Sequence, residues 1–313
     1  MWRGLSINPD VVFATSTPLT IGIPAVCVSK AKRKPLVFEV RDLWPEVPIA
    51  LGIVKGRLFI NMARWLEKWI YKSSSRIIAL SPGMKDGVLA VVKDVSVDVI
   101  PNAADIDLFN TTGSGLDFWK DYPDLLSGKV LLYTGTIGVV NNISYLVDLA
   151  VLLLELNPEI KIAVFGTGAE EGLVWNYAEE KGVLGINFFI YAPIPKKNLP
   201  ELLRRAEFSI STVLPVPELW KNSANKFFDA MAAGVPVLIN YGGWQSDVIV
   251  KHQVGLVLHS QARLEDAKKI VEALRDEEFM LEARRAIYQL ACGEYNREIL
   301  FEKFENSLKS TLA

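Results

Sequence analysis

The chain has 313 residues, of which 50% are hydrophobic and 22% charged, and its formal net charge is −2. These values are typical of a globular protein that is long enough for two domains. Its only cysteines are Cys27 and Cys292, and its only histidines are His252 and His259. The sequence therefore excludes a disulfide framework and a structural zinc cluster, and a reducing, cytoplasmic setting fits best.

Charge is spread unevenly along the chain. The first 110 residues contain 14 Lys and Arg against 10 Asp and Glu, whereas the rest contains 20 against 26. The first part therefore tolerates an anionic partner better, but the imbalance is too mild for a nucleic-acid-binding protein. Residues 1–9 lack the apolar centre of a signal peptide. No apolar run reaches the length of about 18 residues that a membrane span needs.

Short apolar runs alternate with helical patterns throughout the chain. Strands are predicted near 10–15, 35–40, 76–80, 97–100, 129–134, 160–165, 186–190, 208–211, 235–239 and 255–258. Helices between them include 142–156, 170–181 and 197–206, and the chain is helical from Arg263 onward, with a break around Cys292. Such alternation predicts an α/β fold with parallel sheets that are covered on both faces.

The two halves of this pattern are unequal. Residues 129–260 supply six strands, enough for a Rossmann-like domain, whereas residues 1–110 supply about four and begin almost directly with a strand. The N-terminal domain is therefore predicted to be incomplete. The segment 110–127, rich in Gly, Asp and Thr, is the predicted linker.

The most informative segment of the chain is 223–238. It predicts a short helix that Ser223 caps and Gly234 ends, followed directly by a buried strand from Pro236. The helix is apolar almost all round, which is typical of a buried helix.

Three polar residues interrupt this apolar helix in its first two turns. Asn225, Lys226 and Asp229 lie at spacings that bring them onto adjoining parts of one face. A helix N-terminus and a Lys ammonium suit a phosphate, and Asp229 suits the hydroxyls of a ribose. The set predicts a site for a nucleoside diphosphate. The alternative is a solvated ion pair between Lys226 and Asp229.

Further candidate residues follow the predicted strand 35–40. Arg41 and Asp42 come directly after it, and ligands gather beyond the carboxyl ends of parallel strands. We expect both side chains to face the crevice. The alternative is an ion pair in which Asp42 stabilises a turn, with Trp44 and Pro45 as packing.

Two glycine-containing turns follow the first two strands of the second half. Gly135, Thr136 and Gly138 precede a helix, so that backbone and helix dipole favour phosphate there. Gly166 and Gly168 repeat the pattern, and they also suit a tight strand-to-helix turn. Neither turn matches a complete dinucleotide fingerprint.

The segment 56–72 predicts an amphipathic helix. Arg57, Arg64, Lys68 and Lys72 form a basic stripe beside a broad apolar face that contains Trp65. Such a helix suits contact with an anionic membrane surface. The alternative is a domain helix whose apolar face is core.

Together these pieces resemble the retaining GT-B glycosyltransferases of family four, especially the branch that builds lipid-linked surface glycans. In the first half the motifs are Pro9-Asp10-Val11-Val12, Phe38-Glu39-Val40-Arg41-Asp42-Leu43-Trp44-Pro45-Glu46, Leu66-Glu67-Lys68-Trp69-Ile70-Tyr71-Lys72, Leu80-Ser81-Pro82-Gly83-Met84 and Ile100-Pro101-Asn102-Ala103-Ala104-Asp105. In the second half they are Tyr133-Thr134-Gly135-Thr136-Ile137-Gly138, Phe165-Gly166-Thr167-Gly168, residues 225–238 and Tyr241-Gly242-Gly243-Trp244-Gln245. The resemblance covers nearly the whole chain.

The resemblance implies an organisation of the chain. It implies a truncated acceptor-side domain at 1–112, a nucleotide-sugar-binding domain at 113–282, and a C-terminal helix at 283–313 that packs back towards the first. It also implies a metal-independent reaction without cofactor, so that Asp105 and Asp107 fall in a linker motif although they match a metal-binding DxD pattern.

The resemblance also implies roles for individual residues. Asp229 corresponds to the ribose ligand, and the Gly135–Gly138 turn and Lys226 correspond to the diphosphate site. Further donor-binding candidates are Thr136, Gly166, Gly168 and Asn225, and Asp42, Arg41 and Lys226 are the catalytic candidates.

The chain departs from the family pattern at four places. Lys221 stands where the family has its first acidic residue, with Glu218 as a nearby substitute. Val139 stands where a basic residue often follows the glycine turn, and Arg41 stands in place of a His. Relatives also have several more elements before residue 9.

The sequence thus predicts a glycosyltransferase that uses a nucleotide-sugar donor and a lipid-linked or glycan acceptor. It would work in the cytoplasm, with residues 56–72 at the inner face of the membrane, and without nucleic acid. The alternative is a non-catalytic nucleotide-sugar-binding subunit or remnant that needs a partner for its missing N-terminal part. An epimerase is disfavoured by the membrane-type helix.

Overall fold

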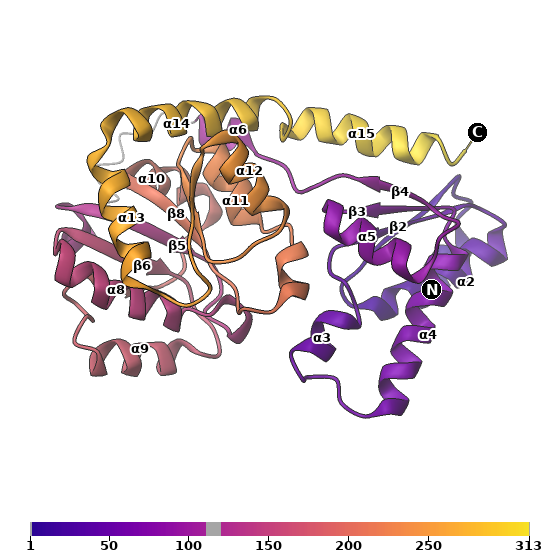
Figure 1. Cartoon of the computed structure of the whole chain (residues 1–313). Coiled ribbons are helices and arrows are strands. Elements are labelled where there is room, and N and C mark those ends of the chain that lie inside the picture. Colours follow the sequence, from indigo (N-terminus) through magenta and orange to yellow (C-terminus); the bar gives the residue numbers. More distant parts are fainter. Residues whose placement is uncertain (1, 111–119, 313) are drawn as a thin grey trace. The chain divides into compact units, whose positions relative to one another are not determined.

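The computed structural model describes residues 2–110 and 120–312, which form two compact units (Figure 1). The first unit contains the residues up to Asn102, the segment Val216–Ser223 and the residues from Glu298. The second contains Ala103–Pro215 and Ala224–Arg297. The contacts thus group segment 216–223 with the first unit, whereas the predicted domain 113–282 includes it.

The first unit has a four-stranded parallel sheet in the order β1-β2-β3-β4. Its strands are β1 (Val12–Thr15), β2 (Leu36–Val40), β3 (Arg76–Ala79) and β4 (Ser96–Val99). Its helices are α1 (Trp2–Ser6), α2 (Gly22–Lys32), α3 (Glu46–Ala50), α4 (Arg57–Ser73), α5 (Pro82–Val91) and most of α15 (Arg297–Lys309). The core combines apolar strand residues with Ile70 and Tyr71 of α4.

The second unit has a six-stranded parallel sheet in the order β10-β9-β8-β5-β6-β7. Its strands are β5 (Lys129–Thr134), β6 (Ile160–Phe165), β7 (Phe188–Tyr191), β8 (Ala206–Ser211), β9 (Val237–Ile239) and β10 (Gly255–Val257). Its helices are α6 (Ile106–Phe109), α8 (Ser144–Leu156), α9 (Glu171–Glu180), α10 (Leu199–Arg205), α11 (Asn225–Ala232), α12 (Trp244–His252), α13 (Leu264–Arg275) and α14 (Glu277–Cys292). In Figure 1 the strands run between α8 and α9 on one side and α11, α12 and α14 on the other.

This strand order contains a topological switch. From β5 the chain adds β6 and β7 on one side and then returns to add β8, β9 and β10 on the other. The loops after β5 and β8 therefore leave the sheet in opposite directions, which opens a crevice at the carboxyl ends of these strands. Ligands of doubly wound folds bind in such a crevice.

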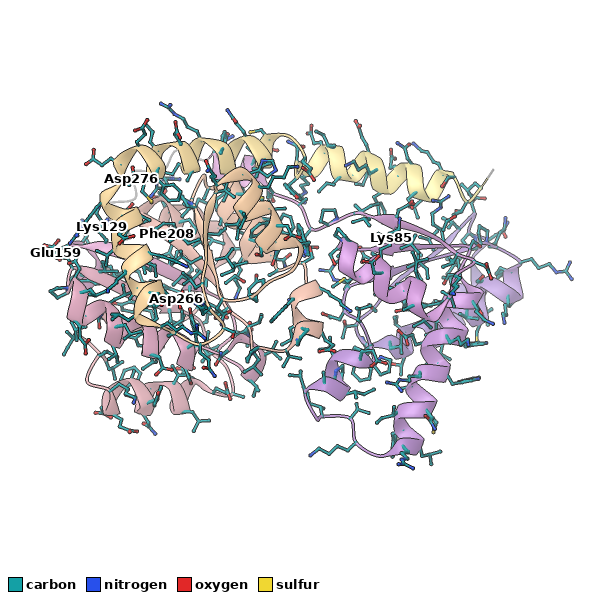
Figure 2. The ribbon with its side chains drawn as sticks, in the orientation of Figure 1. Lys85, Lys129, Glu159, Phe208, Asp266 and Asp276 are labelled. Atoms are coloured by element: carbon teal, nitrogen blue, oxygen red, sulfur yellow. The ribbon has the colours of Figure 1, made fainter. Side chains whose placement is uncertain are left out.

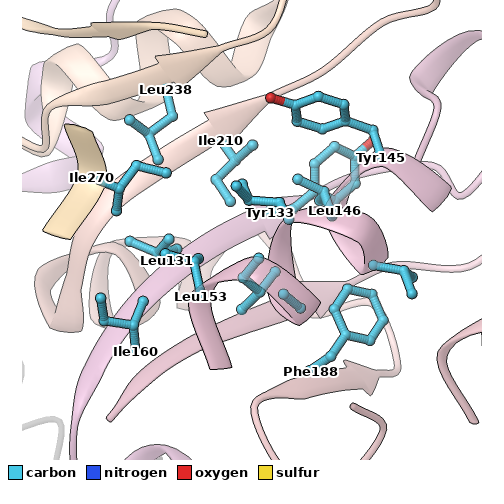
Figure 3. Close-up of a cluster of buried hydrophobic side chains, with 14 of the residues drawn as sticks. Leu131, Tyr133, Tyr145, Leu146, Leu153, Ile160, Phe188, Ile210, Leu238 and Ile270 are labelled. Carbon is cyan, nitrogen blue, oxygen red and sulfur yellow. The ribbon is translucent and has the colours of Figure 1, made fainter. Parts of the chain in front are cut away.

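All ten predicted strands are present, and both sheets are parallel, so the predicted fold class is confirmed. Figure 3 shows why the second sheet forms: apolar side chains from β5, β8 and β9 meet Leu146 and Leu153 of α8 and Ile270 of α13 in one buried cluster. Continuous apolar strands need cover on both faces, and the helices between them supply it.

Among the described residues, one helical segment, 139–156, is long and apolar enough to cross a membrane. The search for apolar runs in the sequence missed this segment. Most of it is α8, the crossover between the parallel neighbours β5 and β6, and six of its side chains are buried in the core. Its apolar character is therefore explained by the sheet that it covers.

One of the two histidines has a clear structural partner. Asp266, in the first turn of α13 (Figure 2), is fully buried, and one carboxylate oxygen lies 2.9 Å from Nδ1 of His259. The other accepts a bond from the backbone N–H of Arg263. The carboxylate thus closes the start of the helix and orients His259.

Candidate donor site at the switch of the second sheet

The site is built at the carboxyl ends of β5 and β8. Gly135 follows β5 directly, and α11 follows the long connection after β8. Helix α11 begins at Asn225, which is exposed, and ends at Ala232 before Gly234, whose φ is 65°. Only glycine adopts this conformation without strain, so the predicted stop at Gly234 is confirmed.

The predicted N-cap of α11 is wrong. The cap is Ala224, which has no side-chain oxygen, whereas the hydroxyl of Ser223 accepts a bond from the backbone N–H of Asn102 at 3.3 Å. Long-range contact with Asn102 thus takes Ser223 away from the helix. As a result, no capping side chain occupies the first turn of α11, and its N–H groups suit an external anion.

Lys226 brings a cation to this helix end. Its ammonium lies 3.9 Å from the centroid of the Tyr133 ring. It also lies 3.5 Å from the point that a side chain at Gly135 would occupy. Within residues 2–110 and 120–312, no carboxylate forms an ion pair with Lys226. Burial lowers the pKa of Lys226 to about 7.

Asp229, one turn further along α11, is half-buried and pairs with another lysine. Its Oδ1 lies 3.8 Å from Nζ of Lys196, so the alternative pair with Lys226 is not formed. Burial raises the pKa of Asp229, as does the charge of Asp105, and Lys196 opposes both.

Lys196 is a site residue that the sequence analysis missed. It belongs to a short 3-10 turn, Lys196–Asn198, which follows β7. Its place in the loop after a parallel strand was the available signal, because such loops gather at the ligand-binding edge.

An open pocket of about 350 Å³ adjoins these residues. It is lined by Thr134, Gly135, Thr136, Phe165, Gly166, Thr167, Pro193, Ile194, Lys196 and Leu199. The structure therefore brings the two predicted glycine turns and Lys196 together at one hollow. Its mixture of apolar walls and few polar groups is typical of small-molecule sites.

The second glycine turn has a steric reason of its own. A Cβ at Gly166 would lie 1.8 Å from the carbonyl oxygen of Gly135, and a Cβ at Gly168 would lie 2.1 Å from that of Ile137. The backbone of the β5 loop is held against this turn by the bond from Ile137 N–H to the Thr167 carbonyl, at 3.0 Å. Both glycines thus permit the close approach of two loops.

Replacing Gly166 by alanine is expected to lower the free energy of unfolding by about 3 kcal/mol, because the new methyl group meets backbone that cannot rotate away. Chemical denaturation measures this loss. Gly172→Ala is the control, since a Cβ there meets nothing within 4 Å, and it is expected to leave stability unchanged or slightly raised. Equal stability of the two variants would contradict the steric explanation.

The first glycine turn is less uniform. Gly135 has a φ of 140°, which a side chain rarely adopts, whereas Gly138 is in an extended conformation open to any residue. The carbonyl of Thr136 accepts bonds from Tyr133 and Asn141, both at 2.9 Å, so the turn is braced from below. Its outer surface is exposed.

Arg41 and Asp42 lie in the first unit, at the carboxyl end of β2. Asp42 accepts a 2.7 Å bond from the hydroxyl of Thr17, and burial raises the pKa of its carboxyl. Arg41 lies 3.7 Å from Glu39, so the two do not form the alternative ion pair with each other.

The acidic pair of the linker has structural partners. Asp105 caps the short helix α6 and forms a 2.7 Å ion pair with Arg297. Among the described residues, no cluster of three potential metal ligands is present.

Comparison with known proteins explains this arrangement. The family model described as glycosyl transferases group 1 matches residues 121–291, and the glycosyl transferase 4-like domain matches residues 2–103. The chain belongs to the group 1 glycosyl transferases. It is therefore a glycosyltransferase of the GT-B type, as the predicted fold and enzyme class state.

Solved structures agree on the fold. The Anabaena protein HepE (Alr3699), solved in complex with UDP, has a TM-score of 0.78 at 17% identity, covering 96% of this chain and 79% of that one. Sucrose-phosphate synthase from Thermosynechococcus elongatus has 0.77 at 16%, covering 96% and 73%. S. aureus TarM has 0.72 at 15%, covering 98% and 57%. No curated protein sequence matches the chain.

Proposed function

We propose that this glycosyltransferase moves a sugar from a nucleoside-diphosphate sugar to a lipid-linked or glycan acceptor, with retention of configuration and without a metal. The observation that carries the donor assignment is the unpaired ammonium of Lys226 beneath Gly135, at a helix end with no capping side chain.

The donor diphosphate would bind between this ammonium, the N–H groups at the start of α11 and the Gly135–Gly138 turn. When the bond to the sugar breaks, negative charge grows on the diphosphate, and fixed positive charge stabilises it most at that moment. Asp229 would accept hydrogen bonds from the ribose, and the 350 Å³ pocket would hold further parts of the nucleotide.

Arg41 and Asp42 are the proposed acceptor-side residues. Because the pKa of Asp42 is raised, its carboxyl is closer than an ordinary aspartate to the range where it can exchange a proton. The Thr17 hydroxyl fixes one of its oxygens and leaves the other for an acceptor hydroxyl.

The donor proposal is tested by thermal stabilisation with UDP, GDP, ADP and CMP. UDP is the first choice, because the HepE structure contains it. A ligand at 100 times its Kd is expected to add about 2.7 kcal/mol to the free energy of unfolding. If none of the four nucleotides raises the Tm of the folded protein, the donor proposal fails.

Helix α4 supports contact with a membrane. Leu58, Phe59, Met62 and Trp65 are 72%, 67%, 57% and 65% exposed and share one side of the helix, and we call them the apolar stripe. Further along, Glu67, Ile70 and Tyr71 are buried, so the alternative core role holds only for the second half of α4. Exposed Arg57 and Lys68 flank the stripe. An apolar stripe beside cations fits an anionic lipid surface.

Replacing Phe59 and Trp65 together by serine is expected to weaken binding to vesicles that contain phosphatidylglycerol by at least about ten-fold, because two large side chains no longer enter the bilayer surface. Vesicle sedimentation measures the binding. A double variant of Leu173 and Val250, which are 68% and 67% exposed on other helices, is the control and should bind like the original chain. Loss in both double variants, or in neither, would contradict a specific role of α4.

A second function, a subunit that binds nucleotide sugar but needs a partner for transfer, is favoured by the edge of the first sheet. Val12 and Ser16 donate backbone bonds towards β2, so the N–H groups of Phe13 and Thr15 point away from it. A pocket of about 540 Å³ with mainly apolar lining adjoins this edge. Transfer or hydrolysis of a donor by the purified chain alone would contradict this alternative.

A further inference from the structure

Two motifs of the first unit have no part in the proposed chemistry, yet both hold the same short segment. Ser81 is fully buried, and its hydroxyl donates a 2.5 Å bond to the carbonyl of Lys221. The same oxygen accepts the N–H of Met84 and so caps α5. The Ser81 hydroxyl is thus shared between its own helix and a residue 140 positions away.

Asn102 holds the end of the same segment. Its Nδ2 donates a 2.6 Å bond to the carbonyl of Ser223, and its backbone N–H donates to the Ser223 hydroxyl at 3.3 Å. Ser223 is 4% exposed. Both polar groups of this serine are therefore occupied by one asparagine.

Packing reinforces these bonds. A Cβ at Gly83 would lie 2.9 Å from Cγ of Lys221, so Gly83 gives room for the lysine stem. Leu219 of the 3-10 turn Pro217–Lys221 is 5% exposed. These contacts explain why segment 216–223 groups with the first unit.

The chain then enters α11 without a spacer. Ser223 precedes Ala224, the N-cap, and Asn225 and Lys226 follow in the first turn. Because Ala224 has no side chain to fix the helix start, the position of the first turn depends on how the preceding residue is held.

We propose that Ser81 and Asn102 are positioning residues for the donor site: by fixing Lys221 and Ser223 they fix the chain that enters α11, and so order its first turn for the nucleotide. This inference rests on the proposed function for its ligand. It also assigns a reason to the motifs 80–84 and 100–105, and to the replacement of the family's acidic residue by Lys221, whose carbonyl rather than its side chain is what Ser81 binds.

The test uses the full chain with Asn102→Asp, which keeps the shape but removes the Nδ2 donor, and Ser81→Ala. Ser81→Thr retains the hydroxyl and should behave like the original. Ser307→Ala is the matched control, because this serine is also buried in the first unit and donates a 2.7 Å bond to Asp98, away from segment 216–223. Two quantities are measured: hydrogen–deuterium exchange of α11 without nucleotide, and the Kd for UDP.

In Asn102→Asp and Ser81→Ala, the first turn of α11 is expected to exchange at least about five-fold faster, and UDP to bind at least about five-fold more weakly, as loss of one buried hydrogen bond predicts. Ser307→Ala should lower Tm without either effect. If α11 exchanges equally in all three variants, the positioning role is overturned. If exchange rises but the original chain binds no UDP, the positioning role stands and the UDP assignment fails.

Discussion

Replacing Lys226 by methionine is expected to lower kcat/KM for the donor by at least about 100-fold while raising the Tm of the nucleotide-free protein by a few degrees at pH 7. The loss follows because the leaving diphosphate would lose its one nearby cation on α11. The gain follows because the ammonium is desolvated and has no ion-pair partner in the described parts of the chain, so charging it opposes folding.

The pH dependence of this variant gives an independent signature. The pKa of Lys226 falls from its ordinary 10.5 to about 7 in the folded protein, so between about pH 7 and pH 10 the unfolded chain binds one more proton than the folded one. The stability of the original chain therefore gains from Lys226 as pH rises through this range, and loses as pH falls. Lys226→Met should lack this contribution.

Nucleotide binding should reverse the shift. A diphosphate beside the ammonium favours its charged form, so binding takes up a proton and the affinity falls as pH rises above 7. Calorimetry in two buffers of different ionisation enthalpy measures the proton uptake. Lys226→Arg, which stays charged, is the control and should bind without proton uptake. An unchanged kcat/KM in Lys226→Met would refute the assigned role.

Replacing Asp229 by asparagine is expected to weaken UDP binding by about 10- to 100-fold, because hydrogen bonds from ribose hydroxyls to a charged acceptor contribute about 1.5–3 kcal/mol. The original chain should therefore prefer UDP to 2′-deoxy-UDP, and the variant should bind both with similar affinity. Calorimetric Kd values for the four combinations give the coupling between carboxylate and hydroxyl.

Lys196→Met is the control for this pair. It removes the ammonium at 3.8 Å and leaves the Asp229 carboxylate in place. Since Lys196 lowers the pKa of Asp229, its loss should raise that pKa further. The preference for ribose should then disappear at a higher pH on acidification than in the original chain. If Asp229→Asn retains the full preference, another group holds the ribose.

The strands illustrate what local sequence determines. The runs 129–134 and 160–165 coincide with β5 and β6, because apolar residues in continuous runs have only one stable solution, a buried parallel strand. Gly234 likewise ended α11 as predicted, since a positive φ is a property of the single residue. Where one residue's own chemistry sets the outcome, the sequence was sufficient.

Competition between partners was not visible in the sequence. Ser223 has the ideal composition for an N-cap, but Asn102, from a distant part of the chain, occupies its hydroxyl. Asp229 has Lys226 three residues away, yet it pairs with Lys196 of another loop. In each case two partners of similar strength were available, and packing of distant segments chose between them.

The sequence by itself determined the α/β class, the ten strands and the segment that carries Asn225, Lys226 and Asp229, because periodicity and residue chemistry act locally. Only the tertiary structure decided that Lys226 lies beneath Gly135 without an ion-pair partner among the described residues, and that Gly166 must have no Cβ. It also decided that α4 leaves its apolar stripe exposed. These features depend on which loops and helices meet, and that is set by the sum of long-range contacts.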